Sequence, residues 1–298
     1  MCYKAIERLR PQERVTEMST PIVDTHQHLW DPEVIPCSWL KRVPSLNRAF
    51  GMSDYLEATK GLGVVKSVHV ETDVDEPYME QETKALFRLA DRNDNPLSGI
   101  VASARPEKDG FEQHLEKILG HRALKGIRRI LHTEPDELGQ GKTFIENVGR
   151  LGSYGLSFDI CVLARQLPVA INLVSRCPDV TFILDHCGVP QVKERVLDTW
   201  RADITEMAKF ANVFGKISGV VAYADPANWT KEDLRPYIEH MIESFGWDRI
   251  MFGSDWPVCT LSASYAQWVD ALQSITSGAG LENQGKLFHD NAVRVYRL

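Results

Sequence analysis

Histidine and aspartate side chains close three short apolar runs of the sequence. His26 and His28 follow "PIVDT", Asp185 and His186 end "VTFILDH", and Asp255 ends "RIMFGSD". Residues two apart on a strand point the same way, so His26 and His28 can bind one cation together. Neutral imidazole and carboxylate suit Zn²⁺, and also Mn²⁺ or Fe²⁺. If the three runs are strands of one sheet, these side chains form a candidate metal site at its edge.

Eight β-branched runs recur along the chain at intervals of roughly 25–45 residues, which leaves room for a crossover helix between them. Three intervals, 78–92, 111–119 and 232–245, show the apolar spacing of amphipathic helices. This alternation predicts an α/β fold, a single (β/α)8 TIM barrel, with its active site at the carboxyl ends of the strands. The runs are residues 21–25, 64–71, 97–104, 124–131, 155–163, 180–186, 212–219 and 249–255.

The 298 residues divide into a tail and one barrel domain. We expect residues 1–20 to be a poorly ordered tail and residues 21–298 to form the barrel. Met18 opens "MSTPIVDT", so either Met1 or Met18 is the true start. Residues 30–52 contain three prolines and two tryptophans and predict an extended loop over one end of the barrel.

The net charge of −7 argues against a nucleic-acid or anionic-membrane partner, because both attract a basic surface. No apolar run is long enough to span a bilayer. The six cysteines form no CxxC pair, which indicates free thiols in a reducing, cytoplasmic compartment. We therefore expect a small-molecule substrate, and the composition leaves a homo-oligomer open.

Several motifs together resemble the amidohydrolase superfamily, and more narrowly its lactonase-type branch. They are "DTHQHLWDP", "DHCGVP", "KISG", "GSDWPV" and the terminal "NAVRVYRL", and the resemblance runs from about Pro21 to the C-terminus. That branch includes L-fucono- and L-rhamnono-lactonases and the pyrone dicarboxylate lactonase. The resemblance implies a metal-binding hydrolase of carbohydrate metabolism. Its ligand pattern falls on His26, His28, His186 and Asp255.

The sequence departs from the superfamily pattern on two strands. Binuclear members place a lysine or glutamate at the end of strand four, where this chain has Arg128 and Arg129. Arginine cannot ligate a metal ion, and its charge repels one. Strand five offers Asp159 and Cys161 in place of the histidine that many members carry. We therefore expect at most one divalent ion, zinc or manganese, and leave metal-free catalysis open.

Asp255 is the predicted general base, which takes a proton from the attacking water and returns it to the leaving alkoxide. The alternative is that Asp255 only caps the segment that follows. His186 either ligates the metal or orients the reacting groups. In a metal-free site, the histidines would instead donate hydrogen bonds to the developing oxyanion.

Substrate binding is predicted for Arg128, whose guanidinium can donate two hydrogen bonds to a carboxylate or hydroxyl. Because side chains alternate along a strand, Arg129 should point out of the barrel. Glu71 is either a hydroxyl ligand or structural, and Lys216 either meets the substrate or extends toward solvent. A second arginine six residues after Arg128 would suit a dicarboxylate substrate, but that position is Glu134. This favours a neutral polyol lactone as the substrate. Three tryptophans lie beside the motifs. They either form an apolar wall against a sugar ring of the substrate or pack within loops; they are Trp30, Trp39 and Trp256.

The sequence thus predicts a hydrolase that opens a small lactone, a sugar-acid lactone, to its hydroxy acid. Two alternatives remain open. One is a metal-dependent decarboxylase of an aromatic acid, since related branches cleave C–C bonds with similar strand-end ligands. The other is a catalytically inactive barrel that serves as a binding protein.

Overall fold

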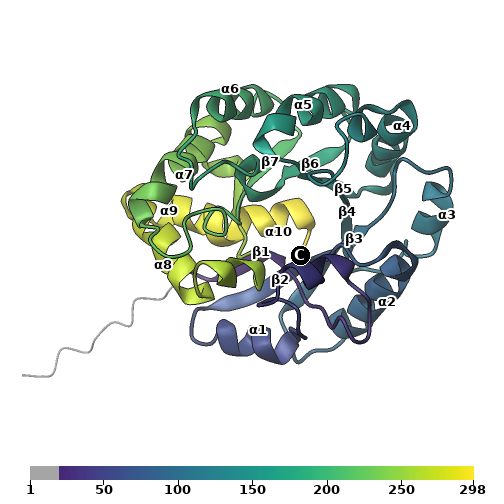
Figure 1. Cartoon of the computed structure of the whole chain (residues 1–298), viewed down its shortest axis with the longest axis horizontal. Helices are drawn as coiled ribbons and strands as arrows, with labels where there is room; N and C mark the ends of the chain where they lie inside the picture. Colours follow the sequence, from purple (N-terminus) through teal and green to yellow (C-terminus); the bar gives the residue numbers. More distant parts are fainter. Residues whose placement is uncertain (1–19) are drawn as a thin grey trace, which may run out of the picture.

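Eight parallel strands form the centre of the protein in a computed structural model that describes residues 20–298 (Figure 1). Neighbours along the chain pair in order from β1 to β8, and β1 meets the end of β8 through a parallel bridge between Gln27 and Trp256. The predicted (β/α)8 barrel is confirmed, and each predicted run overlaps a strand, with β1 continuing two residues beyond its run. The strands are β1 (Ile22–Gln27), β2 (Val64–Val70), β3 (Leu97–Ser103), β4 (Leu124–Ile130), β5 (Ser157–Cys161), β6 (Thr181–Leu184), β7 (Val213–Ile217) and β8 (Ile250–Phe252).

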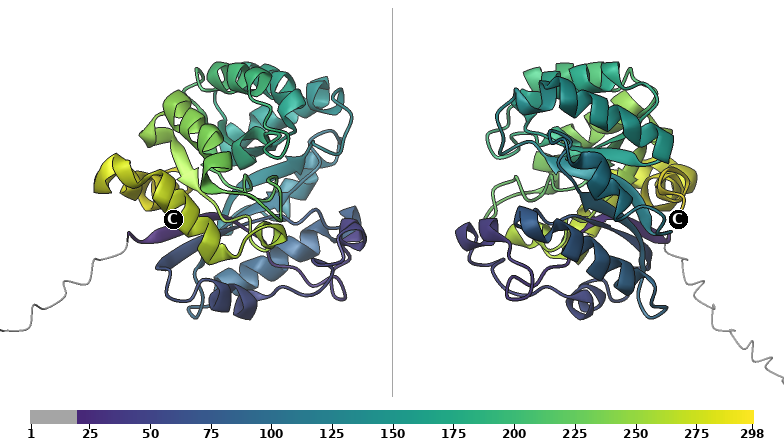
Figure 2. Two further views of the ribbon diagram at one scale, coloured as in Figure 1. Left: turned by 60° about the vertical axis from the view of Figure 1, so that its left-hand side comes forward. Right: turned by 90° about the vertical axis from the view of Figure 1, so that its right-hand side faces the viewer.

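Helices cover the outside of the barrel (Figure 2). The predicted helices 78–92, 111–119 and 232–245 correspond to α2, α3 and α7, with α3 shorter than expected. None of the helices among residues 20–298 is both long and apolar enough to cross a membrane. The helices are α1 (Met52–Ala58), α2 (Met79–Ala90), α3 (Phe111–Glu116), α4 (Lys142–Arg150), α5 (Leu167–Arg176), α6 (Asp198–Met207), α7 (Lys231–Phe245), α8 (Tyr265–Ile275), α9 (Gly280–Gly285) and α10 (Asn291–Tyr296).

The barrel has two apolar cores, one between the strands and the surrounding helices and a smaller one in the lumen. The lumen core consists of inward side chains such as Val23, Val70 and Met251, and Tyr296 of α10 packs against it. The end of the chain lies near the start of β1 (Figure 2). Since β1 starts at the amino end of the barrel, α10 closes that end and leaves the carboxyl ends of the strands free for a site.

The predicted loop 30–52 contains one short 3₁₀ helix, Ser38–Arg42, and is otherwise irregular up to α1. Its two ends are joined by backbone hydrogen bonds between Trp30 and Phe50, of 3.1 and 2.8 Å. The Trp30 indole also donates to the carbonyl oxygens of Leu46 and Arg48. These bonds hold the loop over the carboxyl end of β1.

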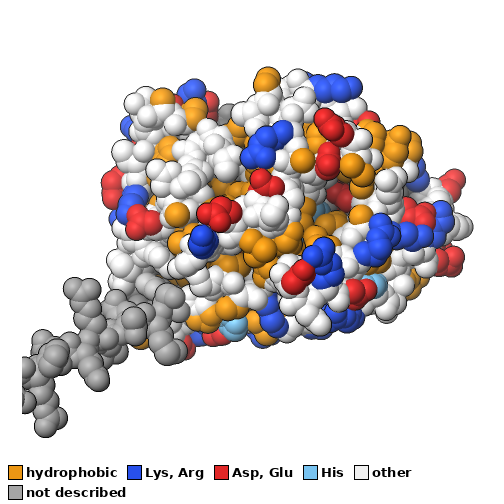
Figure 3. Space-filling model, turned by 90° about the horizontal axis from the view of Figure 1, so that it is seen from below, with side chains coloured by type: hydrophobic (Ala, Val, Ile, Leu, Met, Phe, Trp, Pro, Cys, Tyr) orange, Lys and Arg blue, Asp and Glu red, His pale blue; other side chains and the backbone are white. Residues whose placement is uncertain are grey.

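Acidic and basic side chains are interspersed on the face drawn in Figure 3, where hydrophobic side chains collect around a hollow. The described cysteines are all free thiols, as predicted. The cytoplasmic location inferred from them and the oligomeric state stay predictions. The predicted tail and the choice between Met1 and Met18 fall on residues 1–19, outside the described part of the chain.

Candidate active site

A network around Asp24 fastens the end of β8 to β1. The Ser254 hydroxyl and backbone N–H donate to the Asp24 carboxylate at 2.6 and 2.8 Å. The Tyr55 and Tyr265 hydroxyls donate to the same carboxylate at 2.8 and 3.2 Å. Beside this network, the backbone N–H of Asp255 donates to the carbonyl oxygen of His26 at 2.7 Å. The residues of "DTH" and "GSD" thereby place Asp255 next to the two histidines of β1.

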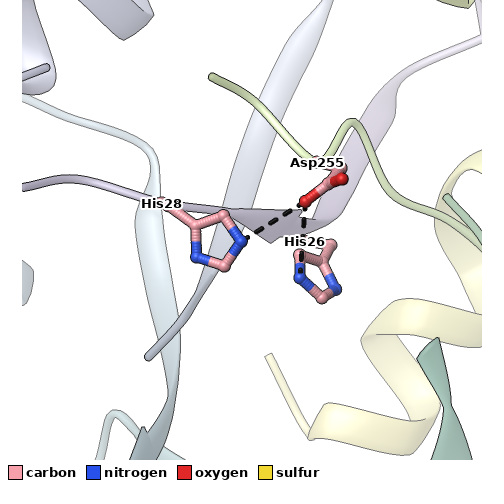
Figure 4. Close-up of side chains that lie close together, drawn as sticks. All are labelled: His26, His28 and Asp255. Atoms are coloured by element: carbon pink, nitrogen blue, oxygen red, sulfur yellow. Dashed lines mark ion pairs between the residues drawn. The ribbon is translucent and has the colours of Figure 1, made fainter. Parts of the chain in front are cut away.

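Three imidazoles surround the Asp255 carboxylate (Figure 4 shows two of them). Asp255 Oδ1 lies 3.4 Å from His28 Nε2 and 3.8 Å from His26 Nε2. His186 Nδ1 lies 4.0 Å from Asp255 Oδ2. The structure therefore brings together the four residues predicted as ligands. Among residues 20–298, no donor forms a hydrogen bond to this carboxylate.

Burial sets the charges of this group. It raises the pKa of Asp255 to about 6, because the ionised carboxylate loses solvation. It lowers the pKa of His28 to about 3, and the nearby Arg128 charge acts in the same direction. Burial likewise lowers the pKa of His26 and of His186. At neutral pH the site thus holds an ionised carboxylate and neutral imidazoles.

The neighbouring polar groups indicate which nitrogen of each β1 imidazole carries the proton. His28 Nδ1 lies 2.7 Å from the carbonyl oxygen of Val70, so Nδ1 carries the hydrogen. In His26, Nδ1 lies 3.3 Å from Asp185 Oδ1 and 3.4 Å from Lys216 Nζ, while Nε2 lies 3.3 Å from Arg128 Nη1. The carboxylate beside Nδ1 and the arginine donor beside Nε2 both favour the same tautomer. The Nε2 lone pairs of both rings therefore face the Asp255 carboxylate.

Two glycines make room for these imidazoles. A Cβ on Gly219, in the motif "KISG", would lie 2.5 Å from His186 Nδ1, and Gly219 has a φ of +64°. A Cβ on Gly253 would lie 2.7 Å from His26 Cβ. The backbone at His186 is itself left-handed, with a φ of 53°, and Asp255 has a φ of 57°. Such conformations cost free energy and cluster at functional sites.

A cavity of about 190 Å³ opens above the site. The predicted residues His28, His186, Asp255, Arg128, Trp30 and Trp39 all line it. Sequence analysis did not assign a role to several polar residues of the same wall, which are Arg42, Thr72, Asp73, His132, Thr133 and Tyr223. Tyr223 lies in a β7–α7 loop, and such loops give no sequence signal for where each side chain points.

Arg128 lies inside the barrel, as alternation predicted, but its guanidinium is largely occupied by the protein. Nε donates to Glu71 Oε1 at 2.8 Å, and Nη2 donates to the Glu71 carbonyl oxygen. Nη1 lies 3.3 Å from both Asp185 Oδ2 and His26 Nε2. Four of the five guanidinium N–H bonds thus have protein partners. One remains for a substrate, which is too few for the predicted fork.

Three substrate-binding interpretations are corrected by these contacts. Glu71 does not line the cavity, because its carboxylate binds Arg128 and the backbone N–H of Asp73. Trp256 also lies outside the cavity lining and packs edge-on against Phe50 and Tyr55. Glu134 pairs with the outward Arg129 at 3.0 Å, so it gives no ground for preferring a neutral lactone.

Lys216 follows neither of its two predicted interpretations. The side chain is fully buried, does not line the cavity and does not reach solvent. Its Nζ lies 2.6 Å from Asp159 Oδ2. Asp159, which strand five offers in place of a histidine, is also fully buried and lies in the lumen beneath the site.

Comparison with known proteins places this geometry in a family. A model of the amidohydrolase family matches residues 23–298. The chain belongs to the amidohydrolase family. It is 32% identical to the uncharacterized protein y4mH of Sinorhizobium fredii, over 93% of this chain and 98% of that protein. It is 27% identical to an L-fucono-1,5-lactonase of Burkholderia multivorans, over 93% of this chain and 96% of that enzyme.

A solved structure resembles the chain closely as well. It is an amidohydrolase from Burkholderia multivorans with bound zinc, with a TM-score of 0.84 and 26% sequence identity, over 93% of this chain and 99% of that one. The predicted family resemblance and the hydrolase class are thus confirmed for this amidohydrolase. The substrate and the roles of individual residues stay predictions.

The donor set of this amidohydrolase fits a divalent metal ion. The ligand atoms of His26, His28 and Asp255 lie within 4.8 Å of one another. Two imidazole lone pairs that face a carboxylate repel it unless a positive charge lies between them. The charges in and beneath the site also leave room for a positive ion. Lys216 and Arg128 pair with three carboxylates, those of Glu71, Asp159 and Asp185, and the Asp255 carboxylate has only imidazoles as partners among the described residues. Arg128 Nη1 competes with such an ion for the lone pair of His26 Nε2.

Proposed function

We propose that this chain hydrolyses the ring ester of a small lactone, a sugar-acid lactone, to the corresponding hydroxy acid. The observation that carries the proposal is the Asp255 carboxylate, which faces the cavity and accepts no hydrogen bond from residues 20–298. A buried carboxylate with a pKa of about 6 is ionised at neutral pH and basic enough to take a proton from water. The similarity to an L-fucono-1,5-lactonase supports the choice of a lactone.

In the proposed reaction, a water oxygen attacks the lactone carbonyl carbon, and Asp255 takes the proton that this water loses. The bond between the carbonyl carbon and the ring oxygen then breaks. The alkoxide that leaves takes the proton from Asp255, which restores the carboxylate. The product is a hydroxy acid, with one water consumed for each lactone opened.

His26, His28 and Asp255 would hold the divalent ion, zinc or manganese. A bound ion would supply positive charge that polarises the lactone carbonyl and acidifies water. Metal-free catalysis, the alternative, needs the histidines to donate hydrogen bonds to the oxyanion. The tautomer of His28 disfavours that role, because Nδ1 donates to Val70 and Nε2 carries a lone pair.

The cavity walls suit a small polar ring. Trp30 and Trp39 stand edge-on to each other with ring centroids 5.6 Å apart, and both line the cavity. His132, Tyr223 and Asp73 supply polar groups that could bind hydroxyls. Arg42 also lines the cavity and forms no ion pair within the described part of the chain. An acidic lactone is therefore as worth testing as a neutral one.

A pH-indicator assay over neutral and acidic sugar-acid lactones tests the proposal. The protein is assayed as purified, after chelation, and after reloading with Zn²⁺ or Mn²⁺. We expect acid release that chelation abolishes and one of the ions restores. Acid release unaffected by chelation would contradict the metal part alone. Release of carbon dioxide from aromatic acids, with no lactone opened, would favour the decarboxylase, and no turnover of either class would favour a binding protein.

A further inference from the structure

A tyrosine with no hydrogen-bond partner for its hydroxyl lies beside Asp255 in the cavity wall. Tyr223 belongs to the loop between β7 and α7, is partly buried, and lines the cavity together with His186 and Asp255. Its ring packs edge-on against the His186 imidazole, with ring centroids 6.4 Å apart. Within the described part of the chain its hydroxyl forms no hydrogen bond. Tyrosine hydroxyls away from bulk water usually find a partner, so this one is free for a molecule that enters the cavity.

The loop around Tyr223 is anchored to the rest of the barrel. The side chains of Val220, Val221 and Ala224 are buried in the core between the strands and the helices. The backbone carbonyl oxygen of Tyr223 accepts a hydrogen bond from the N–H of Lys193 at 3.2 Å. These contacts hold the backbone of Tyr223 in place before a substrate binds. A donor that is positioned in advance costs no reorganisation during the reaction.

The surroundings of Tyr223 keep its phenol protonated. Burial raises the pKa of Tyr223 well above its usual range, and the charge of Asp255 acts in the same direction. Because the effect of a charge falls with distance, the phenol and the Asp255 carboxylate lie close together. The hydroxyl is therefore a neutral hydrogen-bond donor at neutral pH and stays one in mildly alkaline solution.

The other groups around Asp255 offer few hydrogens to a substrate oxygen. The Nε2 atoms of His26 and His28 carry lone pairs, and Arg128 has a single N–H left for a ligand. Attack of water on a lactone places negative charge on the carbonyl oxygen, and hydrogen-bond donors beside that oxygen stabilise the charge. Tyr223 supplies a hydrogen where the two histidines supply none.

We propose that the Tyr223 hydroxyl donates a hydrogen bond to the carbonyl oxygen of the bound lactone, and that this bond strengthens as the oxygen becomes an oxyanion. This role of Tyr223 rests on the proposed function and adds a catalytic residue to it. Tyr223 forms and breaks no covalent bond, because the proton still passes from water to Asp255 and then to the leaving alkoxide. The carbonyl oxygen has two lone pairs, so the hydroxyl does not exclude a metal ion from it.

Removal of the hydroxyl alone tests this role. Tyr223→Phe should lower kcat for lactone opening by about 100-fold, because one oxyanion donor is lost. KM should change by less than about threefold, since the bond reaches full strength only in the transition state. Tyr154→Phe is the matched control, because Tyr154 is exposed and lies outside the cavity lining. Melting temperature and bound metal should equal those of wild type in both variants. A raised KM with unchanged kcat would assign Tyr223 to a substrate hydroxyl and overturn this role.

Binding of two unreactive analogues gives a measurement that needs no turnover. One is a cyclic phosphonate, in which phosphorus replaces the carbonyl carbon and a charged oxygen stands for the oxyanion. The other is a lactam, whose carbonyl is neutral and planar. Both are analogues of the lactone that wild type opens fastest, or of D-glucono-1,5-lactone if it opens none. By calorimetry, Tyr223→Phe should bind the phosphonate at least about tenfold more weakly than wild type does, and the lactam within about threefold.

The two experiments distinguish failure of the Tyr223 donor from failure of the proposed function. A wild type that opens no lactone, but binds the phosphonate more tightly than Tyr223→Phe does, would contradict the proposed function and support the donor. Lactone opening with equal kcat and equal phosphonate affinity in the two proteins would overturn the donor alone. Equal or absent phosphonate binding, together with no turnover, would overturn both.

Discussion

Two buried aspartates at the rim of this barrel, Asp24 and Asp255, differ in the number of hydrogen bonds that their carboxylates accept. Asp24, at the joint of β1 and β8, accepts hydrogen bonds from both Ser254 groups and from two tyrosine hydroxyls. Asp255 comes directly after Ser254, yet its carboxylate accepts none from residues 20–298. Both side chains are almost completely buried.

The difference shows how the fold assigns its buried carboxylates. A carboxylate saturated with donors has no lone pair left for water or metal, and its removal leaves donors unpaired. A buried carboxylate that only neutral imidazoles surround retains lone pairs for a proton or an ion. We therefore expect the joint at Asp24 to contribute to stability, and we propose that Asp255 carries out the chemistry.

The largest expected effect is on activity when Asp255 changes. Asp255→Asn should lower kcat for lactone opening by about 10³-fold or more, because the amide cannot take a proton. In chelator, where no bound ion contributes to stability, the melting temperature should not fall, since no hydrogen bond to the carboxylate is lost. Calorimetry and the indicator assay measure the two quantities on one preparation. A stability loss as large as that of an Asp24 variant would erase the contrast between the two aspartates.

Substitution of Asp24, at the joint of β1 and β8, should have the opposite effect and lower stability. Asp24→Ala should lower the free energy of unfolding by about 3 kcal/mol, because several buried hydroxyl and N–H donors lose their acceptor. Denaturant unfolding of this variant beside Asp255→Asn measures the difference directly. If Asp24→Ala unfolds at the wild-type denaturant concentration, the donors around Asp24 do not stabilise the joint.

A smaller effect should follow from crowding His186. Gly219→Ala places a methyl group 2.5 Å from His186 Nδ1 at a left-handed residue, which should cost about 1–2 kcal/mol. Displacement of the imidazole should also lower kcat, by up to about 100-fold. Gly278→Ala is the control, because a Cβ there meets nothing within 4 Å. Equal behaviour of the two variants would show that the position of His186 does not matter.

The smallest effect should come from the outward arginine of β4. Arg129→Gln removes the ion pairs of the buried Arg129 to Glu107 and to the partly exposed Glu134, and should cost about 1–2 kcal/mol with kcat unchanged. Arg128→Gln, one residue earlier, should cost several kcal/mol, since Glu71 and Asp185 would be left as buried charges. Matched unfolding curves test this pair, and similar losses for both would refute the assignment of Arg128 to the interior.

Strand and ligand positions were predictable because both follow simple periodicities. Alternation placed His26 with His28 and separated Arg128 from Arg129, and the carboxyl ends of parallel strands necessarily meet on one side. The structure confirms that His186 and Asp255 join the two histidines. Each of these inferences needs only the direction of a strand and the residue at its end.

The incorrect interpretations concern side chains whose partners lie far away in sequence. Glu71 was a candidate for substrate binding, but its carboxylate binds Arg128, which lies 57 residues later in the sequence. Lys216 pairs with Asp159 across the same sequence distance. Trp256 stands beside the catalytic candidate but points toward Phe50. No local pattern encodes such pairings, so they became visible only in three dimensions.

Acid release from a panel of sugar-acid lactones, measured side by side for wild type and Asp255→Asn, tests the central claim most directly. The account predicts that wild type opens at least one lactone with one equivalent of acid for each ring, and that the folded Asp255→Asn protein is slower by about 10³-fold. Equal rates for the two proteins, or no lactone opened by metal-loaded wild type, would contradict it.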